Sequence, residues 1–223
     1  LTALVTYYFR VVAQGDYCSS GYSPTGQVTT VAAVPYIALA DHSGGQIGTG
    51  EIKAGSTTNT IYRFQLTVTN TSATLTAVAF TSAGTYGATD ISNFKVYYSA
   101  DSTLEPGSDT LLGTVSSSLG AGAHSVSSFT QGISQDATGY VFITVDVAAS
   151  PTAGATINIS ALTTGDLTFS SGTKSGSTTA GGAQTIITLP TVTSPTATAI
   201  GQTGATLGAN VTSLGGTTIS ARG

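Results

Sequence analysis

The 223-residue chain has no tryptophan, no methionine and a single cysteine, and only 7% of its residues are charged. A single cysteine cannot form a disulfide within the chain, so the redox compartment cannot be inferred from cysteine pairing. The six Lys and Arg residues are scattered along the sequence and the formal net charge is −4. Because no basic patch is available for phosphates, we expect no nucleic-acid partner. The apolar run Val31–Ala40 contains Pro35 and is too short to cross a bilayer, so no membrane span is expected.

Long segments with a helical repeat are also lacking, because glycine and β-branched residues recur throughout the chain. The sequence instead contains 42 Thr, 27 Ser and 28 Gly. Threonine favours strands, glycine favours turns, and hydroxyl groups must supply most of the polar surface. With 40% hydrophobic residues the chain can still bury a sizeable core. We therefore predict an all-β fold made of antiparallel β-sandwich modules in tandem, either Ig/fibronectin-like or jelly-roll-like.

The first residues have a pattern typical of the end of a sandwich. Leu1 lies six residues before Tyr7, and Tyr7, Phe9, Val11 and Ala13 fall on one face of a period-two strand. This segment resembles the tyrosine corner and penultimate strand of a fibronectin type III domain. The resemblance implies that Leu1, Tyr7, Phe9 and Val11 are fold-defining residues.

A hairpin loop at Gly15–Ser20 and a last strand that includes Gln27–Thr30 complete this pattern. Residues 1–33 are therefore predicted to be the C-terminal strands of a fibronectin type III-like domain. At the other end, residues 190–223 are predicted to be the N-terminal strands of a next domain of this kind. Its second strand is expected at Gly204–Val211 and its third at Ile219–Arg222.

A three-stranded fragment would expose unpaired edges and half of a hydrophobic face. We therefore expect the chain to be a window on a longer tandem array, which begins late in one sandwich and ends early in another. This interpretation predicts that Phe9 and Leu207 lie at opposite ends of the molecule. In the alternative, 1–33 and 190–223 fold together as one circularly permuted domain, and these two side chains are in contact.

Residues 36–187 are predicted to form the one complete module. Alternation of polar and apolar residues within Thr60–Thr69 indicates a two-sheet antiparallel sandwich. Tyr140–Val147 is apolar on both faces and is expected at the centre of a sheet, and the second half of Val31–Ala40 is also expected to form a strand. Nine strands bounded by turn residues are predicted at Gln46–Lys53, Thr60–Thr69, Ala73–Thr81, Asn93–Ser99, Thr110–Ser116, His124–Thr130, Gly139–Val147, Ala155–Thr163 and Asp166–Ser170.

Several short motifs follow one another in this module: Gly50–Lys53, Gly55, Tyr62–Phe64, Gly84–Thr85, Asp90–Ile91, Phe94–Ser99 and Gly139–Val147. In this order they resemble the β-sandwich called the BNR-repeat neuraminidase N-terminal-associated domain, over about residues 46–170. The flanking segments Val192–Pro195 and Gly208–Thr212 resemble fibronectin-like repeats. Such modules occur together in very large surface proteins exported by the type IX secretion system. The resemblance implies an extracellular adhesin of the bacterial cell surface, in the class of SprB-like gliding adhesins.

No arrangement of residues points to catalysis. The ten acidic residues are dispersed, and no pair stands out as a general acid with a nucleophile. His42, in a Gly-rich turn, most resembles a catalytic residue, but we expect it to be a solvated loop residue. Sialidase arginines and Asp-box motifs are lacking, so the neuraminidase name implies no activity. We therefore expect neither an enzyme nor a bound cofactor.

The turn-rich loop Ser99–Thr110 contains three acidic residues, Asp101, Glu105 and Asp109. Their carboxylates could hold Ca²⁺, although their spacing does not match the 12-residue EF-hand loop. In the alternative interpretation they only keep an exposed loop soluble.

The same loop also contains two candidate O-glycosylation sites. Asp101-Ser102-Thr103 and Asp109-Thr110-Leu111 match the acceptor pattern of bacteria that use type IX secretion. This resemblance implies attachment at Ser102 and Thr110, and the alternative is a chance match in a hydroxyl-rich chain.

The favoured function is a structural and adhesive repeat that extends a stalk or filament, with neighbouring repeats of the same chain as its partners. Surface polysaccharide and the secretion or motility machinery are further expected partners. The alternative function is a carbohydrate-binding or spacer module of a secreted glycosidase. Exposed aromatic residues stack on sugars in such modules. The tyrosines considered for this role are Tyr17, Tyr22, Tyr86, Tyr97 and Tyr98.

Overall fold

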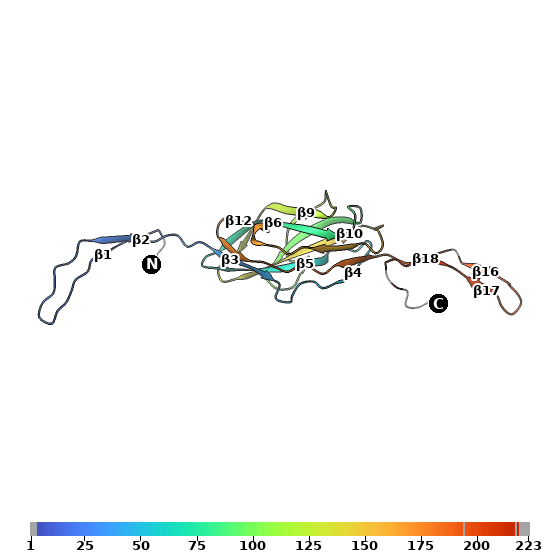
Figure 1. Ribbon diagram of the computed structural model, residues 1–223, viewed down its shortest axis with the longest axis horizontal. Coiled ribbons are helices and arrows are strands. Elements are labelled where there is room, and N and C mark those ends of the chain that lie inside the picture. Colours follow the sequence, from blue (N-terminus) through green and yellow to red (C-terminus); the bar gives the residue numbers. More distant parts are fainter. Residues whose placement is uncertain (1–3, 194, 217, 219–223) are drawn as a thin grey trace.

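The computed structural model describes residues 4–193, 195–216 and 218. A central β-sandwich lies between two terminal β-hairpins, which extend from its opposite ends (Figure 1). No α-helix occurs among the described residues, and no helix there is long and apolar enough to cross a membrane. The all-β prediction is therefore confirmed.

Two six-stranded sheets form the sandwich. The first has the strand order β13 (Thr173–Gly176), β3 (Tyr36–Asp41), β5 (Asn59–Thr69), β10 (Thr138–Val147), β7 (Ile91–Ser99) and β8 (Thr110–Val115). The second has the order β12 (Leu167–Phe169), β6 (Ala73–Gly84), β11 (Thr156–Ile159), β14 (Gln184–Ile187) and β4 (Gly50–Lys53), with β9 (Gly122–Ile133) paired to β6. A single turn of 3₁₀ helix, η1 (Thr164–Asp166), precedes β12.

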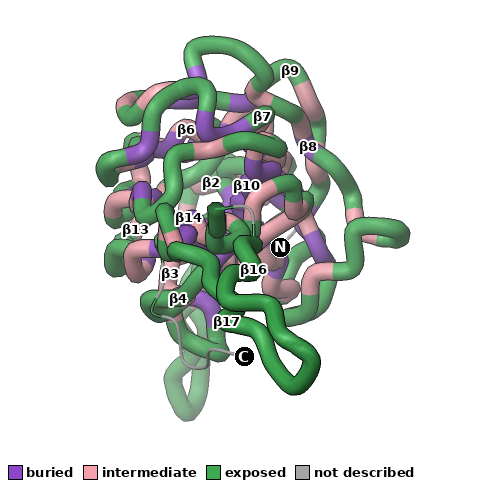
Figure 2. The backbone as a smooth tube through the Cα atoms, turned by 90° about the vertical axis from the view of Figure 1, so that its right-hand side faces the viewer, coloured by how far each residue is buried: buried purple, intermediate pink, exposed green. Residues whose placement is uncertain are grey.

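The strand predictions hold best where the apolar alternation is strong. In β5 the alternate residues from Tyr62 to Val68 are fully buried, and the residues between them are partly exposed. β10 pairs with β5 on one side and with β7 on the other, which confirms its predicted central position. Between the sheets, Phe80 and Phe94 pack edge to face with ring centroids 5.4 Å apart. Buried residues concentrate in the sandwich, whereas the β16–β17 hairpin is exposed along its length (Figure 2).

Each of the nine predicted strands overlaps an observed strand, and β3 occupies the second half of Val31–Ala40 as expected. β13 and β14 were not predicted, and they give the sandwich two parallel pairs, β13 with β3 and β14 with β4. Both missed strands are only four residues long, and β13 contains no apolar residue. Their parallel partners, β3 and β4, are more than a hundred residues away in the sequence, so no local pattern identifies these pairs.

The N-terminal hairpin, residues 4–30, pairs β1 (Thr6–Phe9) with β2 (Gly26–Thr29). A bridge between Gln14 and Ser19 closes the loop that the sequence predicts at Gly15–Ser20. The C-terminal hairpin, residues 191–213, pairs β15 (Thr191–Val192) with β18 (Val211–Ser213) and β16 (Thr196–Thr198) with β17 (Thr206–Gly208). Leu1 and Ile219–Arg222 lie outside the described residues.

The two hairpins emerge from opposite ends of the sandwich, so β1 with Phe9 and β17 with Leu207 lie far apart in the molecule (Figure 1). This arrangement differs from a single permuted domain, in which the two segments would pack together. Their assignment to two fibronectin type III-like domains stays a prediction.

Candidate functional surfaces

His42 is buried, and its expected role as a solvated loop residue is wrong. Only 4% of its surface is exposed, and its ring packs against Tyr140 and Phe142 with centroids 5.2 and 5.6 Å away. The Gly44 amide donates to Nδ1 at 2.9 Å, and Nε2 lies 3.0 Å from the Ser102 carbonyl oxygen. Both ring nitrogens are thus occupied by backbone groups that fix the turn, which leaves His42 unsuited to proton transfer with a substrate.

His124 lies in the core, where its ring contacts the hydroxyl group of Ser82. Ser82 Oγ is 2.8 Å from His124 Nε2 and 2.6 Å from the Tyr86 hydroxyl. Ser82 and His124 are 2% and 7% exposed, and the His124 ring is 4.8 Å from that of Phe94. A serine and a histidine at this distance could form a nucleophile and base, but here they sit in the apolar interior without an open cleft. The group is a buried hydrogen-bond network.

Burial makes both histidines pH-sensitive elements of stability. Desolvation lowers the pKa of His42, with a further contribution from the charge of Arg63, and desolvation also lowers the pKa of His124. The unfolded chain therefore binds protons at a higher pH than the native state does. Stability is fully present above the usual pKa of 6.5 and falls as pH drops from there through the lowered pKa values.

We expect the urea midpoint to change little from pH 7.5 to about pH 6.5 and to decrease from there to pH 5. Each pKa unit between the folded and unfolded values corresponds to about 1.4 kcal/mol of unfolding free energy. A His42→Gln/His124→Gln variant is the comparison, because its slope against pH should be flatter whatever its absolute stability. An unchanged slope in that variant would show that other groups control the acid response.

The carboxylates of Asp101, Glu105 and Asp109 are used within their own loop. Asp101 Oδ1 accepts from the Thr103 amide at 2.8 Å, and Asp109 Oδ2 accepts from the Glu105 amide at 2.6 Å. Glu105 Oε2 accepts from the Ser108 hydroxyl at 3.0 Å. Among the described residues, no group of three or more His, Cys, Asp or Glu side chains could hold a metal ion. The Ca²⁺ hypothesis therefore gains no support from the geometry.

Both candidate glycosylation sites are exposed. Ser102 lies in the loop, and Thr110 is the first residue of the edge strand β8. The Ser102 carbonyl contacts His42, and the residue as a whole is exposed. Accessibility is necessary for modification, so attachment at Ser102 and Thr110 stays a prediction.

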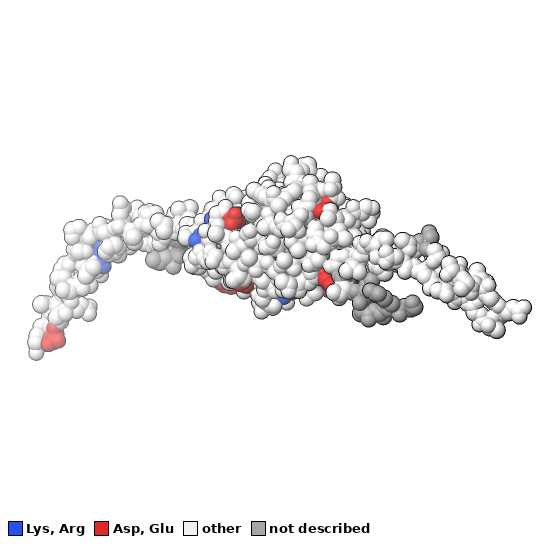
Figure 3. All heavy atoms as spheres, turned by 45° about the vertical axis from the view of Figure 1, so that its right-hand side comes forward, with Lys and Arg blue, Asp and Glu red and all other residues white. Residues whose placement is uncertain are grey.

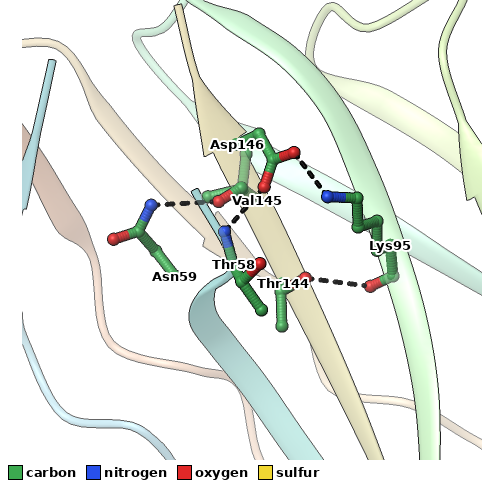
Figure 4. Close-up of polar contacts among 6 residues, drawn as sticks. All are labelled: Thr58, Asn59, Lys95, Thr144, Val145 and Asp146. Atoms are coloured by element: carbon green, nitrogen blue, oxygen red, sulfur yellow. Dashed lines mark hydrogen bonds and ion pairs between the residues drawn. The ribbon is translucent and has the colours of Figure 1, made fainter. Parts of the chain in front are cut away.

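Asp146 and Lys95 form a partly buried ion pair between the neighbouring strands β10 and β7. Lys95 Nζ donates to Asp146 Oδ2 at 2.7 Å, and the two side chains are 23% and 8% exposed. The other carboxylate oxygen accepts from the Thr58 amide at 2.6 Å, and Asn59 Nδ2 donates to the adjacent Val145 carbonyl (Figure 4). The pair thereby ties the start of β5 to β10. It is a structural connection between neighbouring strands.

The structure separates the tyrosines considered for sugar binding. Tyr86 and Tyr97 are buried, at 4% and 6% exposure, and Tyr98 is half-buried against the core. Tyr17 and Tyr22 are 101% and 72% exposed, and both belong to the N-terminal hairpin. Only this hairpin therefore offers aromatic faces from the predicted set to a ligand.

The exposed apolar side chains define two candidate interaction surfaces. Except for Tyr36 and Leu111, every large hydrophobic residue that is exposed in the described part of the chain lies in residues 4–34 or 189–214. Phe9 is 54% exposed in one hairpin and Leu207 is 77% exposed in the other. Apolar surface marks sites of protein or ligand contact where it is contiguous and extensive, whereas single scattered residues do not. Few charged atoms accompany it, since acidic and basic groups are sparse and scattered on the face shown in Figure 3.

Neither a family model nor a curated protein matches this chain. Among solved structures, a chain from a cohesin–dockerin complex is similar at 14% identity and a TM-score of 0.31, over 67% of this chain and 99% of that chain. A family 123 glycoside hydrolase from Clostridium perfringens is similar at 9% identity and a TM-score of 0.33. That match covers 70% of this chain and 28% of the hydrolase. Similarities at this level do not indicate what this chain does.

Proposed function

We propose that this chain is a structural and adhesive repeat segment of a large secreted bacterial cell-surface protein, where it extends a stalk or filament for surface adhesion or gliding. The observation that carries the proposal is that the exposed large apolar side chains, apart from Tyr36 and Leu111, lie in the two terminal segments 4–34 and 189–214, at opposite ends of a well-packed sandwich. The sequence resemblance to type IX-secreted adhesins supports the extracellular location.

The physical basis is that neither hairpin can stabilise itself. A two-stranded hairpin in water is marginally stable at best, because it has no second layer to cover its apolar face. Phe9 and Val11 at one end and Leu207 at the other are exposed in this way. Neighbouring repeats of the same chain are the partners that would cover both surfaces. Stacking would then place successive sandwiches along one axis, and the surface between the contacts would be available to polysaccharide or motility machinery.

The sandwich fits a spacer role and not a catalytic one. Its histidines are buried, and its paired Asp146 and Lys95 connect two strands. We therefore propose that the segment is not an enzyme. Its polar surface consists mainly of hydroxyl and backbone groups, which suits a solvated stalk with few long-range charge interactions.

A tandem duplicate of the chain tests the proposal. It places the C-terminal hairpin of the first copy directly before the N-terminal hairpin of the second. We expect amides near Leu207 in the first copy and Phe9 in the second to become protected from hydrogen exchange, because packing of the two hairpins excludes water. The outer hairpins of the same molecule are the internal control and should continue to exchange quickly. Equally fast exchange at the inner and outer hairpins would contradict the repeat function.

The alternative, a carbohydrate-binding or spacer module of a secreted glycosidase, is favoured only by the exposed rings of Tyr17 and Tyr22. Aromatic faces of this kind can stack on sugar rings. A screen against neutral oligosaccharides distinguishes the two functions. Binding that is lost in Tyr17→Ala or Tyr22→Ala and retained in Val31→Ala, an exposed non-aromatic control, would favour the alternative.

A further inference from the structure

The C-terminal hairpin contacts the sandwich at its start and again at its end. The chain leaves the sandwich after β14, at Thr188, and returns to the same place after β18, at Gly215. The Thr188 amide donates to the Gly215 carbonyl oxygen at 2.8 Å. Gly215 is buried, although the neighbouring Leu214 is 50% exposed. The returning strand is therefore held against the point from which the hairpin departs.

Two adjacent glycines make this contact, and neither position accommodates a side chain. Gly215 and Gly216 have φ values of +72° and +88°, which L-residues with a Cβ rarely adopt. A Cβ on Gly215 would overlap the Thr188 carbonyl oxygen. A Cβ on Gly216 would lie 2.6 Å from the Gly154 nitrogen and 2.9 Å from the Ile186 oxygen. The approach is thus backbone against backbone, and any larger residue would separate the two surfaces.

The backbone groups of Gly154 and Ile186 that contact Gly216 are held in place by the core. The Gly154 amide donates to the Ile186 carbonyl oxygen at 2.8 Å, and the Ile186 amide donates to the Ala155 carbonyl oxygen at 2.7 Å. The Ile186 side chain is fully buried and Ala155 is 4% exposed. The hairpin therefore rests on two connected segments of the sandwich, the end of the loop before β11 and the strand β14.

The connection at the other end of the sandwich has no comparable contact. Residues 31–34, all of them described, reach the sandwich through one long hydrogen bond, from Asn70 Nδ2 to the Val34 carbonyl oxygen at 3.5 Å. Val31 is 86% exposed within this connection. The double attachment through glycines is therefore a specific feature of the C-terminal end and not a general property of the hairpins.

We propose that Gly215 and Gly216 form a clasp that fixes the direction of the C-terminal hairpin and makes the hairpin and the sandwich move as one body. The clasp is an intramolecular interface whose partner surface is the backbone of Gly154, Ile186 and Thr188. It does not depend on whether the chain serves as an adhesive repeat or as a spacer, because the contacts lie within one copy.

Pulsed electron paramagnetic resonance on the full chain tests the clasp. Spin labels are placed at Glu51→Cys in β4 and Gln202→Cys in the hairpin loop, both exposed positions, in a Cys18→Ser background. With the clasp intact, we expect a single narrow distribution of label-to-label distances. Gly215→Ala and Gly216→Ala should each lose this narrow distribution, because the added methyl group pushes the returning strand away. Thr188→Pro, which removes the amide donor to Gly215 and fixes the backbone φ at that position, should have the same effect.

Gly204→Ala is the matched control, since a Cβ at Gly204 has no neighbour within 4 Å in the same hairpin. It should keep the parent distribution. Circular dichroism checks that the sandwich stays folded in every variant. If both glycine variants unfold the sandwich, the distribution of label-to-label distances in Thr188→Pro decides whether the clasp exists. A broad distribution in the parent, or a parent-like distribution in the clasp variants, would overturn the proposal.

Discussion

Replacing Phe94 with alanine is expected to remove about 3–5 kcal/mol from the unfolding free energy of the sandwich. The ring is fully buried, packs against Phe80 with centroids 5.4 Å apart, and is 4.8 Å from the ring of His124. Alanine would leave a cavity that strands on both sheets cannot collapse to fill. Because small domains have unfolding free energies of only about 5–15 kcal/mol, this loss is a large fraction of the total.

Urea unfolding followed by circular dichroism or tyrosine fluorescence measures this effect, since the chain has no tryptophan. Phe9→Ala is the matched control: the same side chain is removed from the N-terminal hairpin, where it is 54% exposed. We expect the Phe9 change to shift the sandwich transition by less than about 0.5 kcal/mol. Similar shifts for the two variants would mean that the hairpin contributes to the same cooperative core, contrary to the packing described above.

The second large effect is expected for Asp146→Asn, at about 2 kcal/mol near neutral pH. Asparagine retains an oxygen that can accept from the Thr58 amide, but it loses the charge that faces Lys95 Nζ at 2.7 Å. Asp136→Asn makes the same chemical change at an exposed turn and should have little effect. Chemical denaturation of the two variants and the parent at one pH gives the comparison directly.

The pH dependence of Asp146 provides an independent check. Burial by itself would raise its pKa, but hydrogen bonds from Lys95 and the Thr58 amide outweigh burial and hold the pKa below the usual 3.8. A carboxyl with a lowered folded-state pKa stabilises the protein above its unfolded pKa, and this contribution is lost as pH falls through the folded value. The parent should therefore lose stability below about pH 4, and Asp146→Asn should lose less over that range. Parallel curves for parent and variant would contradict a stabilising ion pair.

Several features of the sandwich could be predicted because they depend on local patterns. Alternation along β5 and the two-sided apolar character of β10 specify which side chains face the core and which strand is central. Glycine and hydroxyl-rich segments between them mark the turns. The sequence could identify candidate site residues only by their residue type. The identity of Asp101 or His42 does not show which backbone groups form hydrogen bonds with its side chain.

The sequence by itself determined that this chain is all-β, sparsely charged and built around one large apolar core. Those properties follow from composition and from a two-residue repeat, both of which are readable within a few residues. Tertiary structure decided the rest: the burial of His42 against Tyr140, the parallel partners of β13 and β14, and the contact of Gly215 and Gly216 with the end of the sandwich. Each of these depends on groups that come together from distant parts of the chain. The backbone hydrogen bonds and close packing that join them can be made by many different residues of suitable size. Long-range pairing of this kind leaves little trace in the residues themselves, so only the folded arrangement reveals it.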